Sequence, residues 1–183
     1  LAFAAEFPTI GFDNDSSRVE QLQDGFDRNL EVDKGLIASS ELTFTADDTC
    51  VTNAEFIVVT VPTPVTKDNR PDLGPLESAS ELIGKKLRDR SNGTTTPIIV
   101  FESTTYPGCT EDFCGPIIER ESGLKSGEGF ILGYSPERTN FGDAEHTLET
   151  VVKVVSGQNS EGAKVIRDVY SRIAKAGGHM APN

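Results

Sequence analysis

Short apolar runs, rich in β-branched residues, alternate along this chain with longer segments whose apolar residues recur at helical spacing. The clearest run covers residues 55–61, which are apolar on both faces, as expected for a central parallel strand. Leu76, Ala79, Ile83 and Leu87 then mark one face of a helix. Because parallel neighbouring strands need a crossover connection, usually a helix, the alternation predicts an α/β fold.

The same pattern places the other elements. Strands are expected at residues 8–12, 42–44, 97–101, 130–134 and 151–155, and helices after Asp15, near Cys50, and over residues 111–121 and 160–175. In the first of these helices, Val19, Leu22 and Phe26 recur at helical spacing. Right-handed crossovers would cover both faces of the sheet, which predicts a Rossmann-like doubly wound parallel sheet with helices on both faces. We expect one domain, residues 1–183.

Residues 1–7 have a helical composition without an N-cap, a capping box or an initiating Met. We therefore expect a helix entered midway, in a chain that starts inside a longer natural sequence. The sequence contains no Gly-x-Gly-x-x-Gly motif, which is the phosphate-binding turn of dinucleotide-binding folds. The expectation is that the first strand and this turn precede Leu1.

Charge and composition argue against several classes of function. The 183 residues carry a formal net charge of −12, which repels nucleic acids and anionic membranes. No apolar run approaches the roughly 20 residues that span a bilayer. Three cysteines are too few for a disulfide scaffold, so we expect a reducing compartment, the cytoplasm. Cys109 and Cys114 have no second pair or histidine nearby, so we interpret them as free thiols and expect no metal site.

Polar segments follow four of the predicted strands, at the sheet edge where ligands bind in open α/β folds. They are Asp13 and residues 60–64, 102–105 and 135–138. A carboxylate at the position of Asp13 can accept hydrogen bonds from the adenosine ribose hydroxyls and repels a 2′-phosphate, which favours NAD over NADP. The alternative for Asp13 is a turn residue next to a helix cap.

Each of the other segments also has a structural and a functional interpretation. Pro62 and Pro64 end a strand, because proline cannot donate to the ladder. The hydroxyls of residues 102–105 either cap the next helix or bind a ligand or a water. Glu137 and Arg138 offer a base and an anion clamp. Taken singly, each segment is explained better by structure than by catalysis.

Taken together, these segments resemble the UDP-glucose/GDP-mannose dehydrogenase family. The sequences that carry the resemblance are Gly-Phe-Asp at 11–13, Val-Pro-Thr-Pro at 61–64, Arg-Pro-Asp-Leu at 70–73, Glu-Ser-Thr-Thr-Tyr-Pro-Gly at 102–108 and Tyr-Ser-Pro-Glu-Arg at 134–138. The resemblance covers nearly the whole chain. Residues 137–143 are similar to the N-acetylhexosamine branch of the family, although Phe141 stands where this branch often has proline.

The resemblance implies NAD-dependent oxidation of the C6 alcohol of a UDP-N-acetylhexosamine to the uronic acid, in two hydride transfers. Glu137 would be catalytic, as an acid/base or water-orienting group in thioester hydrolysis, together with Thr104. Substrate would be bound by Glu137, Arg138 and Asn140. The implied cofactor-binding residues are Asp13, Arg18, Val61, Pro62, Thr63, Ser103 and Thr104.

The resemblance also implies parts that this sequence does not contain. The nucleophilic cysteine of the family lies in a Gly-rich segment of a later substrate domain, and none of the three cysteines here matches it. The chain by itself is therefore predicted to be inactive, and the full-length protein is expected to form a homodimer or higher oligomer through a dimerisation domain. Two alternatives are a UDP-glucose 6-dehydrogenase and a non-catalytic Rossmann module that binds a nucleotide.

Overall fold

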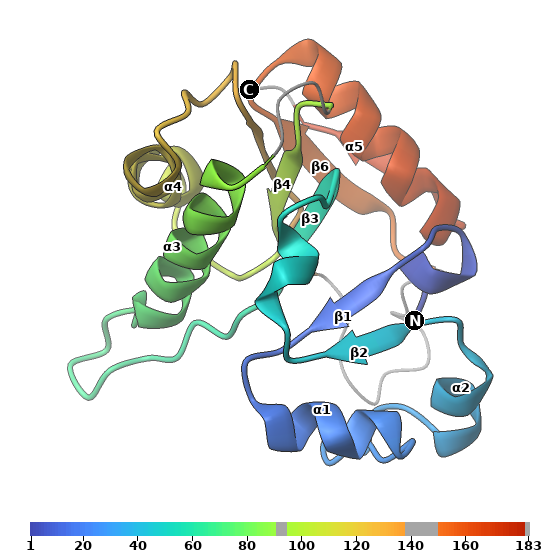
Figure 1. Cartoon of the computed structure of the whole chain (residues 1–183). Helices are drawn as coiled ribbons and strands as arrows, with labels where there is room; N and C mark the ends of the chain where they lie inside the picture. Colours follow the sequence, from blue (N-terminus) through green and yellow to red (C-terminus); the bar gives the residue numbers. More distant parts are fainter. Residues whose placement is uncertain (91–94, 138–149, 182–183) are drawn as a thin grey trace. The chain divides into compact units, whose positions relative to one another are not determined.

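The computed structural model describes residues 1–90, 95–137 and 150–181. The chain divides into two compact units, Leu1–Cys50 and Val51–Asn183 (Figure 1). Among the residues that the sequence singled out, Arg138 and Asn140 lie outside the described ranges.

The first unit is built on two short parallel strands, β1 (Ile10–Phe12) and β2 (Thr43–Thr45). Both were predicted, as was a short helical turn near Cys50, which is the 3-10 helix η2 (Asp48–Val51). The helical prediction for residues 1–7 is confirmed only as a 3-10 turn, η1 (Phe3–Ala5), since no side chain caps it. The helix α2 (Lys34–Ser39), capped by the side chain of Asp33, was not predicted.

Helix α1 (Ser16–Gln23) begins where the sequence indicated, because the Asp15 side chain accepts a hydrogen bond from the Arg18 N–H at 3.1 Å. Val19 is buried on its inner face. The helix nevertheless ends before Phe26, which is 50% exposed, so the predicted apolar face is one turn too long. The chain leaves the helix through Gly25, whose φ of 75° suits glycine.

The second unit is a five-stranded sheet in the order β3-β4-β5-β6-β7. Strands β3 (Phe56–Val59), β4 (Ile98–Phe101) and β5 (Ile131–Tyr134) are parallel neighbours at the predicted places. The predicted helices are α3 (Gly74–Arg88), α4 (Gly115–Ser122), which a π-helical segment η3 (Thr110–Cys114) precedes, and α5 (Ser160–Ile173). These elements confirm the predicted α/β class.

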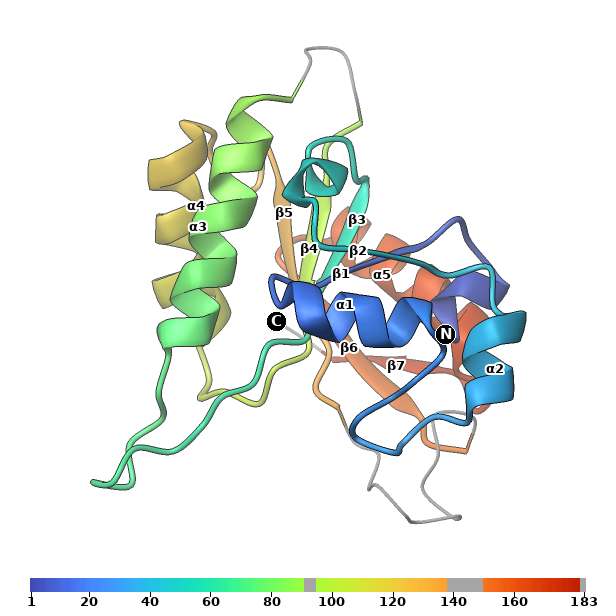
Figure 2. The same ribbon diagram turned by 60° about the horizontal axis from the view of Figure 1, so that its bottom comes forward.

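Helices cover both faces of this sheet. Helices α3 and α4 lie side by side on one face, and α5 packs on the other (Figures 1 and 2). The core between these layers is apolar, because β4 is buried along its whole length and Ile118, Leu132 and Ile166 are almost fully inaccessible. The predicted apolar face of α3 is confirmed, with Leu76, Ile83 and Leu87 buried.

Two strands of this sheet differ from the prediction. Strand β6 (Lys153–Gly157) is antiparallel to β5, whereas a fully parallel sheet was expected. The sequence indicates no helix between the two strands, and only a parallel pair needs a crossover helix. Strand β3 was expected to be central, but within this unit it pairs with β4 alone and is only partly buried. A further strand, β7 (Gly178–Met180), pairs parallel to β6 and was not predicted.

Gly157, the last residue of β6, allows α5 to pack closely on the sheet. A Cβ atom at this position would lie 2.5 Å from the backbone nitrogen of Ala163 and 2.8 Å from its Cα. We expect Gly157→Ala to lower the free energy of unfolding by about 2 kcal/mol, because the helix backbone has to shift. Denaturant unfolding measures this, with Gly178→Ala as the control, since an added Cβ there meets its nearest atom at 3.4 Å. Equal stability of the two variants would contradict the prediction.

Candidate functional site

The register of the parallel strands brings three of the predicted polar segments to one edge of the sheet. Val59 lies beside Phe101, and Phe101 lies beside Tyr134, so β3, β4 and β5 end level with one another. The segments that begin at Thr60, Glu102 and Ser135 therefore leave the sheet together. This is the carboxyl edge, where ligands bind in open α/β sheets.

Two hydroxyl groups tie the first two of these segments together. Ser103 Oγ donates to the Val61 carbonyl oxygen at 2.6 Å, and Thr63 Oγ1 donates to the Thr104 carbonyl oxygen at 2.8 Å. Ser103, one of the hydroxyls for which a helix-cap role was considered, therefore bonds to the neighbouring loop instead, and η3 (Thr110–Cys114) has no side-chain cap hydrogen bond at its N-cap. The prolines at positions 62 and 64 follow the end of β3, as expected. The Thr104 side chain is exposed, whereas Ser103 is buried and serves to join the two loops.

A buried lysine connects the second and third segments. Lys153 Nζ lies 3.1 Å from Glu102 Oε1 and 3.1 Å from Glu137 Oε2. The lysine side chain is 2% exposed and that of Glu102 is 13% exposed, but the side chain of Glu137 is 38% exposed. One ammonium thus lies between two carboxylates, of which only Glu137 reaches well into solvent.

Tyr170, on α5, contacts both Glu102 and Lys153. Its hydroxyl donates to Glu102 Oε1 at 2.7 Å, and its ring centroid lies 5.6 Å from Lys153 Nζ. The ring is fully buried and meets Phe56 edge to face, with 6.3 Å between the centroids. Burial, followed by the negative charge of Glu102, raises the pKa of Tyr170 far above its ordinary value. Tyr170 is therefore a neutral hydrogen-bond donor at physiological pH.

The antiparallel strand explains how Lys153 reaches this edge. In the β5-β6 pair, Tyr134 lies opposite Ser156, and continuing this register by three residues places Glu137 opposite Lys153. Because β6 runs against β5, its first residue is at the carboxyl edge of β5. The sequence analysis missed this lysine. The available signal was a charged residue inside the otherwise apolar run 151–155, since a buried charge needs partners.

Asp13 follows β1 in the first unit, as predicted. Its backbone N–H donates to Thr45, and its Oδ1 accepts the N–H of Asp15 at 2.9 Å. That hydrogen bond is the one expected of the alternative interpretation, a turn residue before a helix cap. Asp13 thus lies between β1 and α1. This is the position from which a strand-end carboxylate binds a ribose in dinucleotide-binding folds.

Arg18, in the first turns of α1, forms an ion pair with Asp27. Arg18 Nη2 lies 2.6 Å from Asp27 Oδ1, and the side chains are 14% and 4% exposed. Asp27 also accepts backbone N–H groups of Asn29, Glu31 and Val32. Burial raises the pKa of Asp27, but the hydrogen bonds from Arg18 and these three N–H groups outweigh burial and lower it to about 2.

The same arginine provides a test of whether NAD fits this unit. Arg18 Nη1 is buried and has no hydrogen-bond partner among the described residues. An unpartnered guanidinium N–H costs free energy, and a phosphate oxygen or ribose hydroxyl of a dinucleotide would satisfy it. Arg18 is thus held in place by Asp27 and keeps one donor for a ligand, which fits the predicted role.

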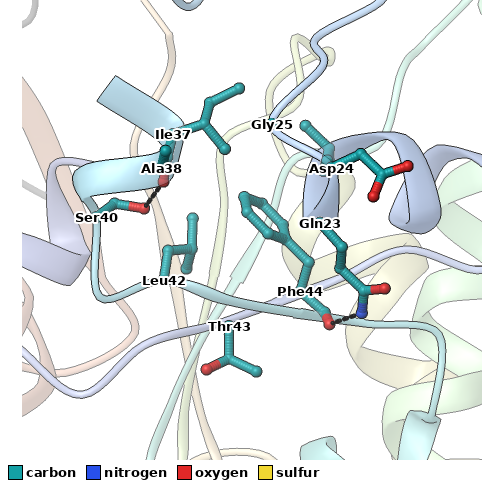
Figure 3. Close-up of a pocket in the computed structure, with 10 residues that line it drawn as sticks. Gln23, Asp24, Gly25, Ile37, Ala38, Ser40, Leu42, Thr43 and Phe44 are labelled. Atoms are coloured by element: carbon teal, nitrogen blue, oxygen red, sulfur yellow. Dashed lines mark hydrogen bonds between the residues drawn. The ribbon is translucent and has the colours of Figure 1, made fainter. Parts of the chain in front are cut away.

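Two surface cavities in the first unit involve none of the predicted site residues. One, of about 350 Å³, lies among the ends of α1, α2 and β2, where Ile37, Leu42 and Phe44 face one another (Figure 3). Gln23 closes one side by donating to the Phe44 carbonyl oxygen at 2.9 Å. The other, of about 500 Å³, lies beside η1 and β1. Neither is at the carboxyl end of β1.

Cys109 and Cys114 are free thiols, as predicted. Cys109 and Cys114 are buried beside the π-helical segment. Burial raises the pKa of Cys114 to about 12, so this thiol is not ionised at neutral pH. A neutral thiol is a poor nucleophile, so Cys114 is not activated for nucleophilic chemistry in this environment. Among the described residues, no helix is long and apolar enough to cross a membrane.

Comparison with known proteins identifies the family. Residues 2–174 match the UDP-glucose/GDP-mannose dehydrogenase family, NAD binding domain. The chain belongs to this family. Protein CapL of Staphylococcus aureus is 44% identical over 99% of this chain and 41% of its own length. The UDP-N-acetyl-D-glucosamine 6-dehydrogenase of Pseudomonas aeruginosa is 42% identical over 99% of this chain and 43% of its own length.

Solved structures agree with the fold. The NDP-N-acetyl-D-galactosaminuronic acid dehydrogenase of Methanosarcina mazei is 27% identical, with a TM-score of 0.81, over 99% of this chain and 40% of that one. The UDP-glucose dehydrogenase of Pyrobaculum islandicum is 26% identical, with a TM-score of 0.82, over 98% of this chain and 42% of that one. These matches confirm the predicted family, the Rossmann-like fold and NAD as the cofactor of this domain family. The chain spans about two-fifths of the length of these relatives.

Proposed function

We propose that this chain is the NAD-binding part of an enzyme that oxidises the C6 alcohol of a UDP-N-acetylhexosamine to a carboxylate. The net reaction converts one CH2OH group, two NAD⁺ and one water into a carboxylate, two NADH and three protons. NAD supplies the hydride acceptor when it is bound. The protein has to remove protons, orient the water and hold the reacting groups, which is the work assigned to the residues of this chain.

The observation that carries the proposal is the position of Glu137. Its carboxylate lies at the carboxyl edge of the sheet, is 38% exposed, and is held by Lys153 at 3.1 Å. A partly exposed carboxylate fixed by a buried cation can accept a proton from a water or alcohol in the same orientation at each turnover. We assign Glu137 the acid/base or water-orienting role in thioester hydrolysis, together with Thr104 on the loop after the neighbouring strand β4.

Each unit by itself carries proposed cofactor-binding residues. Asp13 would accept the adenosine ribose hydroxyls, and Arg18 would use its buried Nη1 toward the ligand. The loop made of Val61, Pro62 and Thr63, tied to Ser103 and Thr104, would form a wall for NAD. Its two hydrogen bonds keep this wall in one conformation before the ligand arrives, which lowers the entropic cost of binding.

The N-acetylated sugar is supported by two observations. The relatives that are 42% and 40% identical to this chain are UDP-N-acetyl-D-glucosamine 6-dehydrogenases, whereas the UDP-glucose 6-dehydrogenase AglM of Haloferax volcanii is 28% identical. Residues 137–143 also resemble this branch, apart from Phe141. Arg138 and Asn140 are proposed to bind the substrate, and the structure does not describe them.

The experiment is an assay of NADH formation by a protein that spans the full length of the relatives and includes this chain. UDP-N-acetylglucosamine, UDP-N-acetylgalactosamine and UDP-glucose are compared. We expect turnover with an N-acetylated sugar. Turnover with UDP-glucose alone would replace the N-acetyl assignment, and NAD binding without turnover of any of the sugars would favour the non-catalytic alternative. The chain of residues 1–183 alone is expected to be inactive.

Asp13→Asn provides a separate test of the cofactor assignment in that protein. We expect NAD to bind about tenfold more weakly, because a charge-assisted hydrogen bond to the ribose is lost, and the preference for NAD over NADP to fall. Calorimetric titration with both dinucleotides measures the two effects. Glu31→Gln, which removes one charge from an exposed position of the same unit, is the control. Unchanged NAD affinity in Asp13→Asn would leave Asp13 with its turn role alone.

Three further assignments complete the proposal. The net charge of −12 supports a small anionic substrate held by a few local cations, rather than a nucleic acid or a membrane surface. The presence of three cysteines, too few for a disulfide scaffold, supports a cytoplasmic location. We further propose that the full-length protein is a homodimer or higher oligomer, and that residues 1–183 belong to its NAD-binding domain.

A further inference from the structure

Lys153 is difficult to explain as a stabilising residue. It begins a strand whose next residues are Val154 and Val155, and its side chain is 2% exposed. Burying an ion pair costs desolvation free energy, and replacing such a group with apolar residues is often neutral or stabilising. A lysine at this position therefore indicates a function that an apolar residue could not perform.

The two carboxylates around Lys153 differ in a way that points to this function. Glu102 is 13% exposed and is fixed from a second side by the Tyr170 hydroxyl at 2.7 Å. Tyr170 is in turn fixed by complete burial and by its edge-to-face contact with Phe56. Glu137, by contrast, is 38% exposed and lies three residues beyond the end of β5. The rigid side of the group is Glu102 with Tyr170, and the accessible side is Glu137.

We propose that Lys153 is a positioning residue that transmits this rigidity to Glu137. Glu102 and Tyr170 hold the ammonium in the core, and the ammonium holds Glu137 Oε2 at 3.1 Å. The Glu137 carboxylate therefore keeps one orientation at the sheet edge although its own segment has left the sheet. This inference rests on the proposed role of Glu137 in the oxidation reaction, and it adds the group that orients Glu137.

The test is a double-mutant cycle on kcat in the full-length enzyme, with the variants K153M, E137Q and K153M/E137Q. A misplaced catalytic group costs about 100-fold, so we expect K153M to lower kcat by about that factor. Loss of the carboxylate in E137Q should cost about 1000-fold. If Lys153 acts through Glu137, the double variant is about 1000-fold slower than wild type, because nothing remains to be positioned.

Two results of this cycle would overturn the proposal. One is a kcat of K153M within about threefold of wild type. The other is a double variant slower by about the product of the single effects, roughly 100,000-fold, since independent contributions multiply. Failure of the wild-type enzyme to form NADH with any UDP-sugar would overturn the proposed function and this role with it. An active wild type with either of the first two results overturns only the role of Lys153.

A second variant, K153M/E102Q, controls for misfolding of K153M. Removing the lysine leaves the buried Glu102 without its cation, and K153M/E102Q removes that uncompensated charge. Thermal unfolding reports whether stability returns. If the role of Lys153 is purely structural, kcat returns together with stability in K153M/E102Q. That result would also overturn the proposal. A positioning lysine predicts that stability returns and kcat stays about 100-fold low.

Discussion

Glu137→Gln is expected to lower the kcat of the full-length enzyme about 1000-fold, within the range that general acid–base catalysis contributes. Glutamine keeps the size of the side chain but cannot accept a proton at neutral pH. The KM for the UDP-sugar should change by less than about tenfold, since the variant retains hydrogen-bonding atoms of the same shape. Steady-state NADH formation over a range of UDP-sugar concentrations separates the two constants.

The structure predicts that this variant still folds. Lys153 keeps Glu102 as a partner at 3.1 Å when the charge of Glu137 is removed, so no buried cation is left alone. Glu128→Gln is a matched control, because Glu128 is exposed in the same unit and precedes β5. That variant should retain wild-type kcat. A Glu137→Gln enzyme with wild-type kcat would exclude the residue as acid/base and leave the substrate-binding role to be tested through KM.

Asp27→Ala is expected to lower the free energy of unfolding of this chain by about 3 kcal/mol. The carboxylate is the shared acceptor for Arg18 and for three backbone N–H groups in the loop after α1, and removing it leaves a largely buried guanidinium unpaired. Denaturant unfolding at neutral pH measures the loss. Asp24→Ala is the control, since Asp24 is exposed at the end of the same helix and should cost within about 0.5 kcal/mol.

This loss should depend on pH in a defined direction. The pKa of Asp27 is about 2 in the folded chain and 3.8 as the ordinary value, so the unfolded chain binds the proton more readily. The stabilisation by the ionised carboxylate is therefore fully present above about pH 4 and disappears as the pH falls through about 2. The stability difference between wild type and Asp27→Ala should shrink over that window. A difference that stays constant would show that the charge of Asp27 is not what stabilises the loop.

The positions of the predicted site residues could be inferred from the sequence, but their contacts could not. Asp13, residues 61–63 and residues 102–104 could be found because each follows an apolar run, and the end of a strand can be read from where such a run stops. Parallel pairing then places the ends of β3 and β4 at one edge of their sheet. What the hydroxyls do at that edge was not predictable. Ser103 and Thr63 bond to carbonyl groups more than 40 residues away rather than to their own helix.

The sequence by itself determined the class of fold, the family and the strand-end residues, because these depend on local periodicity and on short motifs. Only the tertiary structure decided the direction of β6, and with it the partners of Glu137. Hydrophobic alternation is the same for a parallel and an antiparallel strand, so it carries no information on direction. Reversing β6 brings Lys153, Glu102 and Tyr170 together from positions up to 68 residues apart, a grouping that no local pattern contains.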